Sequence, residues 1–241
     1  KYWAEVFFPA VAEIRRKKIF QPRAERLTTT CKEIDLGVTK IIDVGAGYGI
    51  FLDEWKKLNP ESEVIAVEPM SSLANECRRK GFFVVEAIAE KVTNLNDFAD
   101  LVVCFEVLEH VFDPLDFIRV LKKMTRPGGY VFISTLCIDG FDLQMLWDKS
   151  SQISPPHHIN FLSLNGFKSL FDRAGLTNIQ LTTPGRLDVD IVRNNVKSIS
   201  NKTNIYKFLN KIINDEIIAE NFQNILAKNQ LSSHVWVIGE K

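Results

Sequence analysis

Short apolar runs alternate with longer amphipathic stretches along most of the chain, and this alternation begins near residue 40. The apolar runs predict buried strands at residues 40–44, 64–67, 82–85, 101–105, 130–134, 176–182 and 235–238. Apolar residues three or four positions apart predict helices at 50–58, 71–80, 114–124, 141–147 and 163–174. This alternation predicts an α/β fold with a mainly parallel sheet and helices on both faces.

Polar and small residues mark the ends of several of these elements. Ser71 or Ser72 is placed to cap the start of the helix at 71–80, and Gly81 is placed to end it. Gly175 should end the helix that begins near Ser163. The segment 126–129, with the sequence Arg-Pro-Gly-Gly, is predicted as a turn before the next strand.

The chain divides into a core and two flanking helical segments. Residues 1–39 are predicted as an N-terminal helical extension, and residues 40–183 as the core. Residues 184–232 are too long for a simple loop and carry apolar residues at helical spacing. They predict a helical insertion that either caps a site or forms a contact in an oligomer such as a homodimer. Residues 233–241 complete the core as its last strand.

Composition excludes several classes of protein. The 241 residues are 46% hydrophobic, which is enough for one sizeable core. Thirty basic residues balance thirty acidic ones, so charge gives no indication of a nucleic-acid partner. No apolar run approaches the roughly 20 residues that span a membrane, and no signal peptide is recognisable. Cysteines stand singly and predict reduced thiols in a cytoplasmic protein, at positions Cys31, Cys77, Cys104 and Cys137.

Candidate chemistry begins with a glycine-rich stretch between the first predicted strand and the first core helix. After Asp43 it runs Val44, Gly45, Ala46, Gly47, Tyr48 and Gly49. Glycines permit positive φ and bring backbone N–H groups close to a ligand, and the helix start that follows suits an anion such as a carboxylate. A dinucleotide fingerprint would place its third glycine at Ile50, so the spacing disfavours a nicotinamide-dependent oxidoreductase.

Acidic residues follow the next strands in turn. Glu68, followed by Pro69, lies 19 residues after Gly49 and can accept hydrogen bonds from both hydroxyls of a ribose. Glu86 and Ala87 end the third strand, where an adenine ring would lie. Phe105 and Glu106 end the fourth strand and would pass beneath the ligand. In an open α/β sheet these carboxyl ends converge on one ligand, although Glu86 fits a solvated strand end equally well.

Residues 40–135 resemble the class I S-adenosylmethionine-dependent methyltransferases, in the group that includes ubiquinone-pathway and sugar O-methyltransferases. The resemblance rests on four segments in order, at residues 42–49, 66–69, 104–111 and 126–129. It continues through Pro155-Pro156-His157-His158 to about residue 182. It implies a Rossmann-like fold of seven mostly parallel strands, the last one antiparallel. It also implies S-adenosyl-L-methionine as cofactor and S-adenosyl-L-homocysteine as product.

The resemblance also implies which residues hold the cofactor. The amino-acid tail carboxylate would meet N–H groups of Gly45, Ala46, Gly47, Tyr48 and Gly49. Asp43 would hold the tail ammonium, and Glu68 the ribose. The remaining predicted cofactor residues are Pro69, Glu86, Ala87, Phe105, Glu106 and His110.

Methyl transfer needs alignment of nucleophile and methyl group, plus a base when the acceptor is a hydroxyl. The sequence shows no metal-ligand spacing, so no metal is expected and histidine is the natural base. The catalytic candidates are His157 and His158, in the loop after the fifth strand, and His110. Each also has an alternative role: His110 would hold its loop beside Glu106 and Glu109, and the other two would fix their loop or hydrogen-bond the substrate. His234 is expected to be structural.

The leading expectation is O-methylation of a sugar, nucleotide-linked sugar or glycan hydroxyl, because residues 155–190 resemble proteins of glycan-building pathways. Arg186 or Asp188 would then contribute to the acceptor pocket, unless both are ordinary surface residues. A quinone or phenol acceptor is the alternative and would require an apolar or membrane-facing entrance. A non-catalytic scaffold that retains the cofactor fold is the rival from another class.

Overall fold

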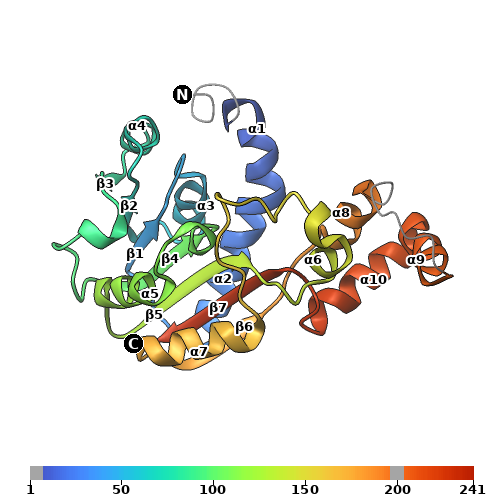
Figure 1. Cartoon of the computed structure of the whole chain (residues 1–241). Coiled ribbons are helices and arrows are strands. Elements are labelled where there is room, and N and C mark those ends of the chain that lie inside the picture. The colour runs from blue at the N-terminus through green and yellow to red at the C-terminus, as the bar shows by residue number, and fades with distance from the viewer. Residues whose placement is uncertain (1–7, 196–203) are drawn as a thin grey trace.

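The computed structural model describes residues 8–195 and 204–241, and within them the chain builds one seven-stranded sheet (Figure 1). The strand order is β3-β2-β1-β4-β5-β7-β6. The strands are β1 (Lys40–Val44), β2 (Glu63–Val67), β3 (Phe83–Val85), β4 (Ala99–Phe105), β5 (Thr125–Leu136), β6 (Thr177–Thr182) and β7 (His234–Glu240). Only β7 runs antiparallel to its neighbours within this sheet, which confirms the predicted fold class.

Helices cover both faces of the sheet, because the strands are apolar on both sides. One face packs against α5 (Pro114–Met124) and α7 (Leu164–Ala174). The other packs against α2 (Gln21–Glu33) and α3 (Ile50–Leu58), where Leu27, Phe51 and Trp55 are fully buried. The other helices are α1 (Phe8–Arg15), η2 (Arg16–Phe20), α4 (Ser71–Arg79), η3 (Ala89–Lys91), η4 (Leu108–His110), α6 (Phe141–Leu146) and η5 (Trp147–Lys149).

The segment between β6 and β7 forms the helices α8 (Asp188–Asn195), α9 (Asn204–Asn214) and α10 (Glu216–Lys228). Figure 1 shows them beside α6, at the opposite end of the molecule from β3. They share a small apolar core with α6 that includes Leu146, Val192 and Ile213. Residues 196–203 of the predicted insertion and residues 1–7 of the predicted extension lie outside the described part of the chain.

Two local predictions were wrong for identifiable physical reasons. Neither Ser71 nor Ser72 caps α4, whose N-cap position is Met70, because the Ser71 hydroxyl donates to the Glu86 carboxylate instead. The segment 126–129 is not a separate turn: it bulges within β5, where Leu101 of β4 pairs with Tyr130. The glycine ends were correct, since Gly81 and Gly175 adopt φ of +85° and +78°.

A buried carboxylate joins the starts of β1, β4 and β5. Asp100 Oδ2 accepts hydrogen bonds from the backbone N–H groups of Thr39 and Lys40, both at 2.8 Å, and from the Thr39 hydroxyl at 2.7 Å. Its Oδ1 accepts from Arg126 Nε of the bulge. Burial alone would raise the pKa of Asp100, but Arg126, Thr39 and Lys40 outweigh it and hold the pKa below its usual range.

We predict that Asp100→Asn lowers the free energy of unfolding by about 2–4 kcal/mol, because the amide cannot satisfy this set of donors. Asp97→Asn is the matched control, since Asp97 is exposed and its side chain pairs with Lys241 at the surface. It should cost less than about 1 kcal/mol. Urea denaturation at neutral pH measures both. Because the pKa of Asp100 is lowered, the difference in unfolding free energy between the unmodified protein and Asp100→Asn should shrink as the pH falls through that pKa. Equal losses of stability in Asp100→Asn and Asp97→Asn at neutral pH would contradict the role given to Asp100.

Candidate active site

A cavity of about 250 Å³ lies at the carboxyl ends of β1 and β4, beneath the N-terminal helices. The glycine turn after β1 forms its floor and the turn after β4 forms one wall. Arg15, Phe20 and Arg23 from the N-terminal helices close it from above. The other lining residues are Asp43, Gly45, Ala46, Gly47, Tyr48, Ile50, Phe105, Glu106 and Val107. The predicted glycine stretch, Asp43, Phe105 and Glu106 therefore meet in one place.

The glycine turn requires glycine for two separate reasons. Gly45, Gly47 and Gly49 have φ of +79°, +56° and +64°, a region that side chains disfavour. A Cβ atom on Gly45 would also lie 2.6 Å from Cγ2 of Val107. The turn after β4 therefore approaches the turn after β1 more closely than any larger residue at position 45 permits.

The N–H groups of this turn are largely committed within the protein. Those of Gly45 and Ala46 donate to the Val67 carbonyl, and that of Gly49 donates to the Ala46 carbonyl. The Gly47 N–H donates to Glu68 Oε2 at 2.8 Å. These bonds differ from the expectation that the N–H groups would receive a carboxylate. An anionic ligand group here would need positive charge from elsewhere in the cavity.

Arg23 can supply that charge, and sequence reasoning missed it. It projects from α2 into the cavity, buried, with its guanidinium carbon 4.6 Å from the centre of the Phe105 ring. Burial lowers the pKa of Arg23, although Glu106 opposes the effect. Nothing in the sequence pattern singles out Arg23, because it lies 20 residues before Asp43 in a helix with other basic residues.

Asp43 is the least compensated group in the cavity. Its side chain is buried, and its Oδ1 has no hydrogen-bond partner in the described part of the chain. Burial, reinforced by the nearby charge of Glu68, raises the pKa of Asp43 to about 8. A buried carboxylate with an unused acceptor favours a cationic ligand group, because a cation would restore the ionised form.

Glu68 lies at the end of β2 and is held by two backbone donors. Its oxygens accept from the N–H groups of Gly47, at 2.8 Å, and Met70, at 2.9 Å. Burial raises the pKa of Glu68, and the two hydrogen bonds offset this only in part. The carboxylate is thereby fixed between the glycine turn and the start of α4, where its remaining lone pairs can accept hydrogen bonds from a ligand.

Glu106 joins four separate segments at the cavity wall. Its φ is +54°, and its Oε1 accepts from Arg23 at 3.1 Å and from the Ser134 hydroxyl at 2.7 Å. His234 Nδ1 lies 3.6 Å from the same oxygen. Desolvation would raise the pKa of Glu106, but His234, Arg23 and Ser134 together lower it. Glu106 is therefore an ionised carboxylate held in one orientation.

His234 is positioned at the cavity by the last strand. Its Nε2 accepts a hydrogen bond from Trp236 Nε1, 3.1 Å away, and the indole nitrogen can only donate. Burial lowers the pKa of His234, so the neutral ring carries its proton on Nδ1, facing Glu106. His234 therefore accepts a hydrogen bond from Trp236 through Nε2, and its Nδ1 faces the Glu106 carboxylate at 3.6 Å without a hydrogen bond.

Six predicted cofactor residues do not line this cavity in the described part of the chain: Gly49, Glu68, Pro69, Glu86, Ala87 and His110. Glu86 accepts from the Ser71 hydroxyl and pairs with Arg78 at 2.8 Å, and both contacts lower its pKa. This arrangement matches the alternative of a solvated strand end for Glu86.

Two of the three histidine candidates are brought together. The rings of His110 and His158 lie 4.8 Å apart in an edge-on arrangement. Nδ1 of His110 lies 2.7 Å from the His157 carbonyl oxygen, and Nδ1 of His158 lies 2.7 Å from that of Gln152. A carbonyl only accepts, so each Nδ1 donates and each neutral ring keeps its lone pair on Nε2. The His157 side chain is exposed, and that residue contributes its carbonyl.

A buried carboxylate lies beside this histidine pair and was not predicted as a site residue. Glu109 accepts from the Thr135 hydroxyl at 2.8 Å, and burial together with the charge of Glu106 raises its pKa to about 7. One atom each from Glu109, His110 and His158 lie within 4.8 Å of one another. Two imidazoles and a carboxylate at such spacing can hold a divalent cation. The expected absence of a metal stays a prediction.

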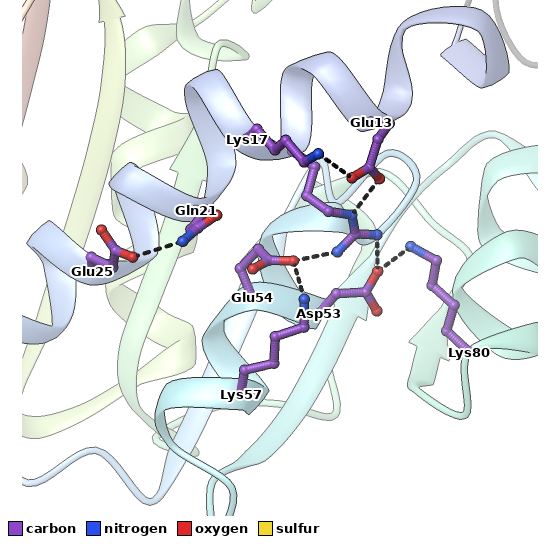
Figure 2. Close-up of polar contacts among 9 residues, drawn as sticks. Glu13, Lys17, Gln21, Glu25, Asp53, Glu54, Lys57 and Lys80 are labelled. Atoms are coloured by element: carbon purple, nitrogen blue, oxygen red, sulfur yellow. Dashed lines mark hydrogen bonds and ion pairs between the residues drawn. The ribbon is translucent and has the colours of Figure 1, made fainter.

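An ion-pair network fixes the N-terminal helices above the cavity. Arg16 pairs with Asp53, at 2.9 Å, and with Glu54, both on α3. Figure 2 shows Asp53 and Glu54 facing the N-terminal helix, with Lys57 and Lys80 joining them.

A larger hollow of about 740 Å³ borders this network at the amino end of β2. Its Arg16, Lys57 and Lys80 are paired with carboxylates, as Arg23 in the cavity is paired with Glu106.

Comparisons with known proteins agree with this geometry. A model of the family described as a methyltransferase domain matches residues 11–181. The ubiquinone biosynthesis O-methyltransferase of Xanthomonas oryzae pv. oryzae is 31% identical over 118 residues, which are 46% of this chain and 48% of that protein. The chain thus matches about half the length of this curated relative.

Solved structures show the same fold. An S-adenosylmethionine-dependent methyltransferase from Archaeoglobus fulgidus superposes with a TM-score of 0.64 at 17% identity, covering 98% of this chain and 100% of that one. A Haemonchus contortus phosphoethanolamine N-methyltransferase, solved with S-adenosylhomocysteine, gives 0.57 at 14% identity, covering 84% and 48%. The chain belongs to the methyltransferase domain family, with the fold of the class I S-adenosylmethionine-dependent methyltransferases.

Proposed function

We propose that this chain transfers a methyl group from S-adenosylmethionine to the hydroxyl of a phenol or quinol. The observation that carries the proposal is the cavity itself, which is lined by the glycine turn, by Arg23 and by Asp43, whose Oδ1 has no hydrogen-bond partner in the described part of the chain. A zwitterionic amino-acid tail presents the two charges that complement this pair. The family and the relatives' names support the same reading.

Each part of the cofactor has a matching group on this chain. Asp43 would hold the tail ammonium, with Glu106 as a second carboxylate at the same wall. Arg23 would receive the tail carboxylate, a role that the committed N–H groups of the glycine turn leave to a side chain. Glu68, held by Gly47 and Met70, would accept the ribose hydroxyls. When bound, the cofactor supplies an electrophilic methyl group on a sulfonium.

The base is assigned to His158 or His110. Each ring is oriented by a backbone carbonyl at Nδ1, which leaves Nε2 to accept the proton of an acceptor hydroxyl. An imidazole Nε2 that carries a lone pair can accept a proton in this way. His157 is reassigned to a positioning role, because its carbonyl holds His110 and its ring is exposed.

The acceptor is argued from the surroundings of the histidine pair. Phe112, two residues after His110, is 97% exposed, and Ile159 is 42% exposed. The Ile159 N–H donates to the Glu109 carbonyl, so both apolar residues belong to the two loop segments that carry the pair. Apolar side chains at this position favour a phenol or quinol over the sugar that was the leading expectation. Asp188 is buried among serines and is not available to a sugar pocket.

A second mechanism uses a bound divalent cation in place of the histidine base. It is suggested by the close approach of Glu109, His110 and His158. A divalent cation held there would lower the pKa of an acceptor hydroxyl and replace the histidine base. Dialysis against a chelator separates the two cases. Full turnover by the chelated, metal-analysed protein supports the base, and turnover that returns only on adding Mg²⁺ or Zn²⁺ supports the cation.

The acceptor and the base are tested together. We expect the chain to methylate catechols and short-chain isoprenoid quinols, and to leave nucleotide-linked sugars unmethylated. His158→Gln or His110→Gln, whichever variant removes the base, should lower kcat by about 10²–10⁴-fold, because proton transfer is lost. His157→Gln is the matched control and should keep kcat within about threefold, since its carbonyl is retained. Methylation of sugars alone, or equal losses in all three variants, would contradict the proposal.

Binding of the cofactor product should release a proton from Asp43. Its raised pKa, about 8, means that the carboxyl is largely protonated at neutral pH, whereas an ammonium partner favours the ionised form. Affinity for S-adenosylhomocysteine should therefore rise by up to about tenfold per pH unit between about pH 6 and 8. Calorimetry in buffers of different ionisation enthalpy measures this. Asp43→Asn should abolish the dependence and Glu86→Gln should keep it; a slope that survives in Asp43→Asn refutes the assignment.

A further inference from the structure

Two buried carboxyl groups meet where the helical insertion joins the core. Asp142 lies in the first turn of α6, and Asp188 is the first residue of α8. The chain returns from α10 past the same point, through Ser232 and Ser233, before β7 begins. Asp142 is 0% exposed and Asp188 is also buried. This cluster lies outside the cavity described above.

Asp188 receives a full set of donors from the returning chain. The Ser232 hydroxyl lies 2.8 Å from both of its oxygens, and the Ser233 N–H donates to Oδ1 at 2.8 Å. Gln223 Nε2 of α10 donates to Oδ2 at 2.7 Å. These N–H and O–H groups occupy the lone pairs that a metal ion would use. The donors around Asp188 therefore leave little room for a bound cation.

Asp142 has no such donors. Neither of its oxygens has a hydrogen-bond partner in the residues that the structure describes. Burial, and the neighbouring Asp188 carboxylate, raise the pKa of Asp142 to about 6, although Ser233 opposes this. A buried acid beside an ionised one is stable when it keeps its proton and donates it to that neighbour.

The other groups that face the pair do not offset its charge. In residues 8–195 and 204–241 no lysine or arginine forms an ion pair with either carboxyl group. His234 interacts electrostatically with Asp188, but burial lowers the pKa of His234 and keeps it neutral. Gln223 is uncharged, and the shared core of α6, α8, α9 and α10 is apolar.

Close packing leaves the pair little freedom. A Cβ atom on Gly140 would lie 2.1 Å from the Ser233 backbone, and one on Gly185 would lie 1.8 Å from Ser232 Oγ. The chain segments on either side of the two carboxyl groups are thus in direct contact. Separating the charges of an ionised pair would require the insertion to move.

We propose that Asp142 and Asp188 share one proton, and that this proton fastens the α8–α10 insertion to the core. With the proton present, the Asp142 hydroxyl donates to an Asp188 oxygen. Loss of the proton to solvent leaves two adjacent buried carboxylates that repel each other, and the insertion loosens. This inference does not rest on the proposed methyl transfer.

The direction of the pH dependence follows from the raised pKa. The docked insertion holds the Asp142 proton more tightly than a solvated carboxyl, whose pKa is 3.8. The stabilisation is therefore complete below about pH 4 and is lost as the pH rises through about 6. One pKa unit corresponds to a tenfold change in an equilibrium constant, so the docking equilibrium should change by at least about tenfold across this range.

Hydrogen exchange of the whole chain tests the proposal, with rates corrected for the intrinsic effect of pH. In the unmodified protein, protection of α8 and α10 relative to the amides of β1 and β4 should fall at least about tenfold between about pH 5 and pH 8. Asp142→Asn keeps a hydrogen-bond donor that cannot ionise, so its protection should stay constant and exceed that of the unmodified protein at the higher pH.

Asp190→Asn is the matched control, since Asp190 lies on the same helix but is exposed and paired with Arg193. It should keep the pH dependence of the unmodified protein. If Asp142→Asn does not fold, the pH dependence of hydrogen-exchange protection in the unmodified protein still tests the proposal. A flat profile between about pH 5 and 8 overturns the proposal, as does a dependence that survives in Asp142→Asn. Protection that instead rises on adding Mg²⁺ or K⁺ would identify a cation in place of the proton and would also overturn it.

Discussion

One carboxylate, that of Glu106, holds the candidate active site together. It receives Arg23 from α2 and Ser134 from β5, and it faces the Nδ1 atom of His234 at the start of β7. These partners come from opposite ends of the chain and meet only because β5 and β7 pair beside β4. Without this carboxylate, Arg23 would lose the hydrogen-bonded ionic partner that offsets part of the effect of its burial. The orientation of the N-terminal helices over the cavity therefore depends on the end of the fourth strand.

The cavity divides its charges in a way that suits a ligand of mixed charge. The charge of Glu106 is compensated by protein groups. Asp43 lines the same cavity, and its Oδ1 has no hydrogen-bond partner in the described part of the chain. The glycine turn brings backbone close to both but uses most of its N–H groups internally. The charged side chains of the cavity would therefore select its ligand, and the backbone of the glycine turn would set the shape of the cavity. In the part of the chain that the structure describes, no helix is long and apolar enough to cross a membrane.

Local sequence pattern was sufficient for the elements that pack by burial alone. The apolar runs at 64–67 and 101–105 became β2 and β4 because both faces of those strands are covered. The antiparallel direction of β7 came from the resemblance, since no local pattern distinguishes it. Ser71 failed as a cap because a distant carboxylate, Glu86, competes for its hydroxyl. Such competition depends on how β3 and α4 meet, which periodicity does not specify.

The site was predictable where it follows strand ends and unpredictable where it depends on distant contacts. Asp43 and Glu106 were found because they end β1 and β4. Arg23 and Glu109 were missed: the first lies in an amphipathic helix among other basic residues, and the second reads as one acid in a polar loop. The histidine pair was found only in part, because the sequence could not show that His158 approaches His110 while His157 turns outward.

Calorimetric titration with S-adenosylhomocysteine tests the central claim, that this cavity and Glu68 beside its glycine turn together form the cofactor site. The unmodified chain should bind with a micromolar dissociation constant. Glu68→Gln should weaken binding by about 1 kcal/mol or more, roughly fivefold, because it alters the carboxylate fixed by Gly47 and Met70. Thermal unfolding of the ligand-free variant checks that it is folded. No saturable binding by the unmodified chain, or unchanged affinity in a folded Glu68→Gln variant, would contradict the account.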